Sequence, residues 1–234
     1  MPPAHDHNTA TISPRTVTML EVGSIMLTVM ITAWAIVPLR LGNRWLESIP
    51  AMLALSLMLH SHWTRGETPR DLGLTHHCFL RALLLLLAPM ALTTAWLVWM
   101  GWRMNSLQFN DHFFPSLAGR TLWGLIQQYA LQSFIYRRVR LVTTDGESTR
   151  PARTRRAIVI TACLFALVHA PNLPLMFLTM VAGLVWCSVF ERAPNVYALA
   201  LSHGLLSVVA ECSLPDAMIR GMVVGLRHLV YLSF

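Results

Sequence analysis

The sequence predicts an all-α fold, a polytopic transmembrane helical bundle of about seven to eight spans. Hydrophobic residues make up 55% of the 234 residues and charged residues only 12%, whereas a soluble domain is usually about 25% charged. Apolar stretches of roughly 18 residues, long enough to cross the hydrocarbon core of a bilayer, recur along the chain. The length of the chain fits one such bundle.

The helices are placed from the apolar stretches and from the turn-forming residues between them. Residues 1–16 are polar, so we expect a disordered tail, followed by a single transmembrane domain over 17–234. Helices are expected over 17–39, 46–63, 80–102, 119–136, 157–170, 173–190 and 195–212. The link at 170–172 is very short and makes the helices on either side antiparallel neighbours. The remainder, 213–234, is either an irregular eighth span or an interfacial helix.

The net charge of +7 is concentrated in short loops. Seven arginines lie between Arg137 and Arg156, and the positive-inside rule makes that loop and the amino terminus cytoplasmic. Arg137 and Arg138 are interpreted as anchors at the membrane surface, with Glu191 or Asp145 as candidate partners. Nucleic-acid binding is excluded because the arginines do not follow an amphipathic face. We therefore expect an integral protein of a bacterial inner membrane, in contact with the lipid bilayer.

Three glutamines interrupt the helix expected over 119–136. Gln128 and Gln132 are four apart and share a helix face, with Gln127 beside them. An unpartnered amide in hydrocarbon costs roughly 2–7 kcal/mol, so these side chains should face protein or a wet cavity. Two histidines, His169 and His203, lie in similarly apolar runs. We expect the three stretches to converge inside the bundle; the alternative is that the glutamines only form interhelical hydrogen bonds and each histidine is a satisfied core residue.

Two imidazoles on neighbouring helices can polarise a carbonyl, hold a water or ligate a metal. No cofactor is certain, and a divalent metal held by His169 and His203 stays open, although two histidines without a third ligand make a poor zinc site. A haem held by both histidines is a further alternative. Residues one or two turns from the histidines, or at a helix end beside them, are the supporting candidates: Phe165, Asn172, Ser207 and Glu211.

The run FALVHAPN at 165–172 and the run ALALSHGLLS at 198–207 resemble the CPBP family of intramembrane proteases. This family contains CAAX prenyl endopeptidases and bacteriocin-processing or immunity proteins. Its pattern is EExxxR on one helix, FxxxH on the next and HxxxN or HxxxD on a later one. The resemblance covers about 118–212 and implies a membrane-embedded peptidase site and a membrane-anchored peptide or protein substrate.

The chain departs from this pattern at its polar positions. Gln127 and Gln128 stand where the family has two glutamates, Gln132 stands where it has the arginine, and Ser207 stands where it has Asn or Asp. The resemblance implies that the first of the two residues activates water and that the histidines hold the water or stabilise the oxyanion. An amide cannot take a proton at neutral pH, and loss of a general base costs ~10²–10⁴-fold. Glu211 is the best internal replacement.

Two functions from different classes follow from this resemblance. The first is a CAAX-type intramembrane endopeptidase that hydrolyses a membrane-anchored peptide or protein. The second is a non-catalytic homologue, a pseudoprotease that acts as a membrane scaffold or binding protein. The two differ in whether a group able to accept a proton lies beside the histidines.

Overall fold

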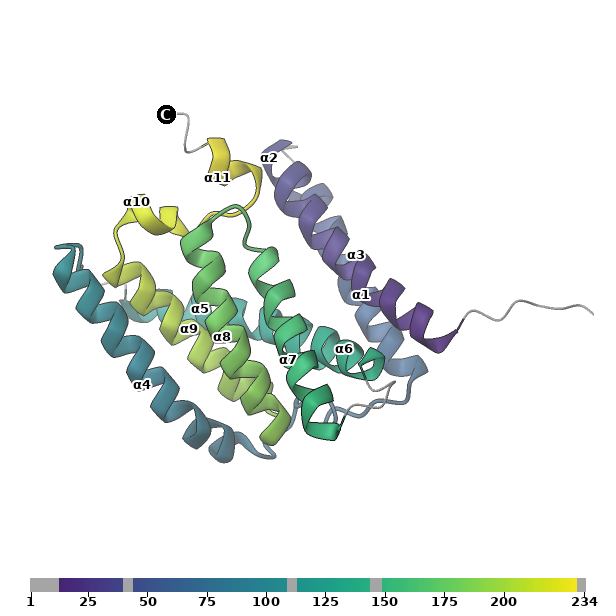
Figure 1. The fold of residues 1–234 in the computed structure, drawn as a ribbon. Coiled ribbons are helices and arrows are strands. Elements are labelled where there is room, and N and C mark those ends of the chain that lie inside the picture. The colour runs from purple at the N-terminus through teal and green to yellow at the C-terminus, as the bar shows by residue number, and fades with distance from the viewer. Residues whose placement is uncertain (1–12, 40–43, 109–112, 144–148, 231–234) are drawn as a thin grey trace, which may run out of the picture.

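The computed structural model describes residues 13–39, 44–108, 113–143 and 149–230, and every regular element within these ranges is a helix. The predicted all-α class is therefore confirmed (Figure 1). The elements in chain order are α1 (Pro14–Ile31), η1 (Thr32–Ile36), α2 (Val37–Leu39), α3 (Arg44–Thr64), α4 (Phe79–Arg103), α5 (Phe113–Gln128), η2 (Tyr129–Tyr136), α6 (Arg137–Val142), α7 (Arg150–Leu167), α8 (Leu173–Arg192), α9 (Val196–Ser213), α10 (Asp216–Ile219), η3 (Arg220–Met222) and α11 (Leu226–Val230).

Local signals set the helix starts. The Ser13 hydroxyl accepts a hydrogen bond from the Thr16 amide at 3.1 Å, and Pro14 occupies the first turn, where its missing N–H costs nothing. Helix α1 therefore begins at Pro14, and the expected tail over 1–16 was too long. Residues 1–12 lie outside the described residues, so their disorder stays a prediction.

The helix expected over 119–136 is longer than predicted. Segments α5, η2 and α6 follow one another without a break from Phe113 to Val142. The middle segment, η2, has π-helical turns and begins directly after Gln128. Such turns inside an α-helix are frequent at functional sites.

Four helical segments in the described ranges are long and apolar enough to cross a membrane: Pro14–Leu39, Phe79–Arg103, Leu173–Arg192 and Val196–Ser213. The protein is an integral membrane protein, but the predicted count of seven to eight spans is not confirmed. Helix α7 has 18 residues but carries four arginines among its first seven, and α5 has only 16 residues. The described part of 213–230 forms only short elements, and 231–234 lie outside it.

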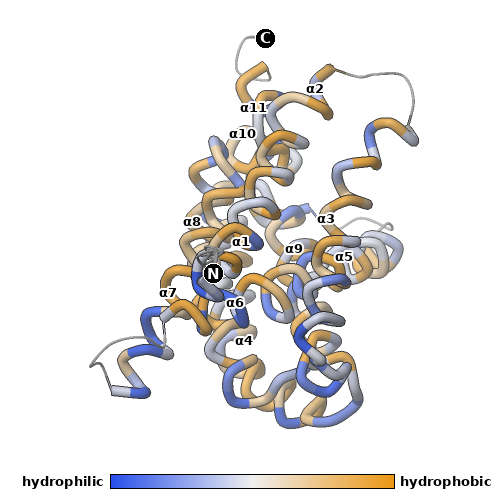
Figure 2. Tube along the Cα trace, turned by 90° about the vertical axis from the view of Figure 1, so that its right-hand side faces the viewer, coloured by the Kyte–Doolittle hydropathy of each residue, from blue (hydrophilic) through white to orange (hydrophobic). Residues whose placement is uncertain are grey.

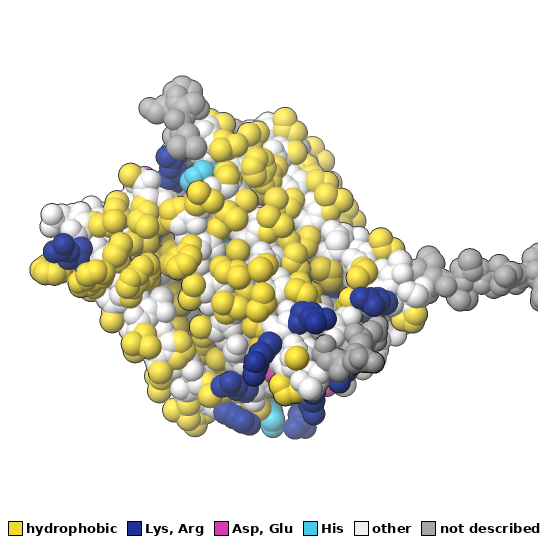
Figure 3. Space-filling model, viewed as in Figure 1, with side chains coloured by type: hydrophobic (Ala, Val, Ile, Leu, Met, Phe, Trp, Pro, Cys, Tyr) yellow, Lys and Arg dark blue, Asp and Glu magenta, His cyan; other side chains and the backbone are white. Residues whose placement is uncertain are grey.

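Helix α9 is the centre of the bundle. It packs against both α4 and α5, and α8 packs against α7 (Figure 1). In the apolar window of α9, 67% of the residues are buried, against 11% in α4, so α9 faces protein while α4 faces outward. Figure 2 shows hydrophobic residues along most of these helices, and Figure 3 shows hydrophobic side chains spread over much of one face, with many arginines toward its lower edge.

A buried charge cluster joins α6 to the amino-terminal helices. The Arg138 side chain is fully buried, and its guanidinium donates to Glu67 at 2.7 and 2.9 Å and lies 3.3 Å from a Glu21 oxygen. The guanidinium also lies 5.0 Å from the centroid of the Phe134 ring. The interpretation of Arg138 as a surface anchor was therefore wrong, because its charge is neutralised inside the protein rather than by water.

The partners expected for these arginines also differ. Arg137 pairs with Glu67 at 2.7 Å, and Glu191 instead pairs with Arg140. Asp145 lies outside the described residues. The loop between α3 and α4 thus supplies the carboxylate that both Arg137 and Arg138 use.

Candidate functional site

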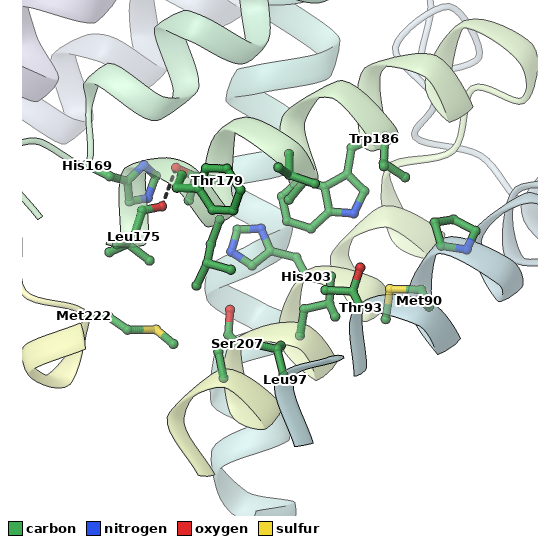
Figure 4. Close-up of a pocket in the computed structure, with 18 of the residues that line it drawn as sticks. Met90, Thr93, Leu97, His169, Leu175, Thr179, Trp186, His203, Ser207 and Met222 are labelled. Carbon is green, nitrogen blue, oxygen red and sulfur yellow. Dashed lines mark hydrogen bonds between the residues drawn. The ribbon is translucent and has the colours of Figure 1, made fainter. Parts of the chain in front are cut away.

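A cavity of about 500 Å³ lies between α4, α5, α8 and α9. Its wall includes Gln127, His169 and His203 from three separate stretches of the chain. Figure 4 shows the two histidines in this wall. The structure therefore brings together the regions that the sequence suggested would converge. Most of the remaining wall is apolar or aromatic.

A glycine lets α5 approach α9 closely enough to hold His203. A Cβ atom on Gly124 would lie 3.1 Å from both Cβ and Cγ of His203. One turn further along α5, the Gln128 amide nitrogen lies 3.3 Å from His203 Nδ1. Because residues four apart share a helix face, Gly124 makes room for the imidazole that Gln128 contacts.

Two buried amides fix the protonation of His203. The Gln132 amide nitrogen donates to the Gln128 oxygen at 3.3 Å, and both side chains are fully buried. With its oxygen used in this way, Gln128 presents its own amide nitrogen to His203 Nδ1, which must accept. The N–H of the neutral His203 ring is therefore on Nε2, and the imidazole is a hydrogen-bond donor toward the cavity.

His169 has the opposite arrangement. Its Nδ1 lies 2.7 Å from the backbone oxygen of Phe165. A carbonyl oxygen can only accept, so Nδ1 carries the proton and Nε2 keeps its lone pair. One imidazole can thus take a proton while the other donates a hydrogen bond to a carbonyl oxygen.

Aromatic rings hold the two imidazoles in place. Trp186 stacks on His203 with ring centroids 4.7 Å apart and an angle of 14° between the planes. Its indole N–H donates to the Ser202 hydroxyl at 2.8 Å. The Phe165 ring lies edge-on to His169 at 4.8 Å and to His203 at 6.3 Å. The sequence indicated Phe165 but not Trp186. A tryptophan inside a span needs a hydrogen-bond partner for its indole N–H, and that need could have pointed to Trp186.

The supporting candidates separate into two groups. Ser207 lines the cavity, whereas Asn172 does not. Asn172 is fully buried, its side-chain oxygen accepts from the Leu175 amide at the start of α8, and its nitrogen donates to the backbone oxygens of Ile219 and Val223. Asn172 therefore ties the chain after α9 to the link between α7 and α8.

Glu211 is not brought into the cavity. Its side chain is 41% exposed and pairs with Arg120 at 2.9 Å. Among the residues that the structure describes, no Asp or Glu lines the cavity, while Arg120 does. The replacement base that the sequence suggested is thus held in an ion pair outside the wall, and Arg120 is a wall residue that sequence reasoning missed.

The donor set does not fit a metal ion. In the described ranges no group of three or more His, Cys, Asp or Glu side chains could hold one. His169 and His203 are only two ligands, and the proton on His203 Nε2 occupies the lone pair that a metal would need. We therefore derive no chemical step from a metal at this site.

Comparison with known proteins finds a match over part of the chain that contributes to this site. Residues 121–209 match the family model described as Rce1-like, type II CAAX prenyl endopeptidase. No curated protein and no solved structure matches the chain. The match falls within the region over which the histidine motifs resemble intramembrane proteases, and it contains Gln127, Gln128, His169 and His203. Residues 121–209 are therefore similar to the Rce1-like type II CAAX prenyl endopeptidases.

Proposed function

We propose that the protein is a CAAX-type intramembrane endopeptidase that hydrolyses a membrane-anchored peptide or protein, with histidines in place of a catalytic carboxylate. The observation that supports this most is the different hydrogen-bond partner of Nδ1 in His169 and in His203, a carbonyl oxygen and an amide nitrogen, from which we infer different tautomers at one cavity. A hydrolase needs a group that accepts the proton of water and a group that stabilises the oxyanion.

The hydrolytic step uses these two groups in turn. The substrate carbonyl oxygen accepts the hydrogen bond from His203 Nε2, and a water molecule lies against His169 Nε2. The water oxygen attacks the carbonyl carbon while its proton passes to His169. The same proton then goes to the amide nitrogen as the C–N bond breaks, which leaves a carboxylic acid and an amine. Gln127, which also lines the cavity, orients the water or the substrate amide.

The setting of the cavity favours a substrate that arrives through the bilayer. Leu92 on α4 and Phe177 on α8 line it and are 72% and 62% exposed, on helices that can cross a membrane. We place the protein in a bacterial inner membrane with a cytoplasmic amino terminus. The four arginines at 150–156 support that orientation.

The test is a cleavage assay in liposomes with a lipid-anchored peptide that carries a fluorophore and a quencher. Separate His169→Ala and His203→Ala variants should each lower the initial rate by ~10²–10⁴-fold. A matched His60→Ala variant, changed on α3 away from the cavity wall, should cleave like wild type. Equal rates for wild type and His203→Ala would count decisively against the proposal.

The absence of a carboxylate from the described cavity wall favours a second candidate, a non-catalytic homologue that binds the same class of ligand. It predicts that wild type does not cleave and that Gln127→Glu combined with Gln128→Glu creates activity. An active wild-type protein defeats this candidate, so one assay separates the two.

A further inference from the structure

The cavity wall contains a single formally charged residue in the described part of the chain, Arg120. It lies on α5, one turn before Gly124, which packs against His203. Its Nη2 donates to Glu211 at 2.9 Å, while Nη1 faces the Met222 sulfur at 3.7 Å. A thioether is a weak acceptor, so the guanidinium has room for a stronger one.

A ligand anion can replace Glu211 as the ion-pair partner of Arg120. The two side chains are 30% and 41% exposed, and partly exposed ion pairs contribute little to stability. An incoming anion can therefore share Arg120 with Glu211 or displace it. The Arg120 guanidinium could then donate two parallel hydrogen bonds to the carboxylate of the ligand, the group with which arginine pairs best.

The rest of the wall suits an apolar chain. Met90 and Leu97 on α4, Leu178 on α8 and Leu206 on α9 all line it. Glu211 lies two residues before the end of α9, so the charged end of the cavity is near one end of a candidate membrane span. That is where the polar head of an amphiphile lies when its tail is in hydrocarbon.

The glutamines favour the same ligand. Gln127 lines the cavity and Gln128 contacts His203, and neither amide carries a charge. Carboxylates at these positions would repel an anion in a medium of low dielectric constant. With one cation available, a monoanion can be neutralised, whereas a dianion would leave an uncompensated charge.

We propose that Arg120 is a specificity-determining residue that selects ligands with a carboxylate at the end of an apolar chain, and that the Glu211 carboxylate competes with the ligand carboxylate for the Arg120 guanidinium. This deepens the proposed function, since the same cavity is used, but binding needs no cleavage. The chemistry fits two sources, a free fatty acid and the carboxyl terminus of an apolar peptide.

The test measures binding of dodecanoate and of dodecanol, which has the same chain without the charge, to the full-length protein in nanodiscs of zwitterionic lipid. Empty nanodiscs supply the background. Wild type should bind dodecanoate at least about tenfold more tightly than dodecanol, as expected for a hydrogen bond to a charged group. Arg120→Met should abolish this preference, and Glu211→Gln should increase it by removing the competing carboxylate.

A matched control removes a positive charge elsewhere. Arg81 is an exposed residue on α4 that does not line the cavity, so Arg81→Gln should bind like wild type. A second arm compares an apolar peptide with a free carboxyl terminus and its amidated form. Preference for the free peptide assigns a peptide source, and preference confined to dodecanoate assigns a lipid source; either supports the inference.

Two results would overturn it: equal binding of dodecanoate and dodecanol to wild type, or an unchanged preference for dodecanoate in Arg120→Met. The outcome is separable from that of the proposed function. A protein that cleaves nothing but shows the charge preference loses only the proposed activity. A protein whose cleavage and binding both ignore Arg120 loses only this inference.

Discussion

One continuous helical stretch, α5 to α6, carries two buried polar networks of different character. In its middle, Gln128 and Gln132 form a neutral network with His203. At its end, Arg137 and Arg138 form a charged network with Glu67. Only the neutral network adjoins the large cavity.

The difference follows from the energy of burial. A buried charge must be paired, so the partners of Arg138 are fixed and serve the fold. Burying a neutral amide with one atom unpaired costs less free energy than burying an unpaired charge. Within the described residues, the side-chain oxygens of Gln127 and Gln132 are buried without a hydrogen-bond partner. A neutral network can therefore be left incomplete beside a cavity, ready for a ligand, and that is where we place the function.

The largest expected effect tests the charged network. Glu67→Gln removes the carboxylate that faces both Arg137 and Arg138 and leaves Glu21 beside the buried Arg138. Removing one partner of a buried ion pair costs up to about 3–5 kcal/mol. Denaturant unfolding in detergent micelles measures the loss. The matched change Glu211→Gln, at a partly exposed ion pair, should cost at most about 1 kcal/mol. Similar losses for the two variants would show that the buried network is not the stronger one.

The same network predicts a pH dependence of stability. Burial alone would raise the pKa of Glu67, but hydrogen bonds from His62, Arg138 and Arg137 outweigh it and hold the pKa well below its usual value of 4.5. The folded-state pKa is thus below the unfolded-state pKa, so the stabilisation is complete above the unfolded value and is lost as the pH falls below it.

Unfolding free energies measured from about pH 7 down to about pH 3 should therefore fall in wild type at the acid end of the series. The fall should be shallower in Glu67→Gln, which has no carboxyl group to protonate at that position. Parallel profiles for the two proteins would assign the acid sensitivity to other groups.

A smaller effect on stability tests the neutral network. Gly124→Ala places a methyl group 3.1 Å from the His203 ring, and overpacking of this kind typically costs about 1–3 kcal/mol. Because His203 must move, cleavage and ligand binding should fall more than stability does. Gly119, on the same helix, has no atom within 4 Å of an added Cβ, so Gly119→Ala should preserve both. Wild-type activity in Gly124→Ala would show that His203 need not be held so closely.

Local patterns in the sequence were enough to find the neutral network. Gln128 and Gln132 are four apart on an apolar helix, and the two histidines lie in recognisable runs, so their convergence could be predicted. The ion pair between Arg138 and Glu67 could not be predicted, because the two residues are 71 apart in the sequence and ion pairing leaves no periodic pattern. The protonation of His203 also depends on contacts between α5 and α9, which only the packing defines.

Tertiary packing also explains one residue that was misplaced, Glu211, and one that was missed, Trp186. Glu211 shares a helix face with His203, but Arg120 holds its carboxylate away from the cavity. In the sequence, Trp186 cannot be told from an ordinary packing residue. Its stacking on His203 is evident only in the folded structure. Helical periodicity gives the face of a residue and not its partner on another helix.

The central claim is that the two imidazoles at the cavity carry their protons on different nitrogens. Side-chain ¹⁵N NMR of protein labelled at its 10 histidines tests this directly, with His169→Ala and His203→Ala spectra to assign the signals. We expect a proton on Nδ1 of His169 and on Nε2 of His203, and a shift of the His203 proton to Nδ1 in Gln128→Glu, whose carboxylate can only accept. The same tautomer for both rings in wild type, or an unchanged His203 tautomer in Gln128→Glu, would contradict it.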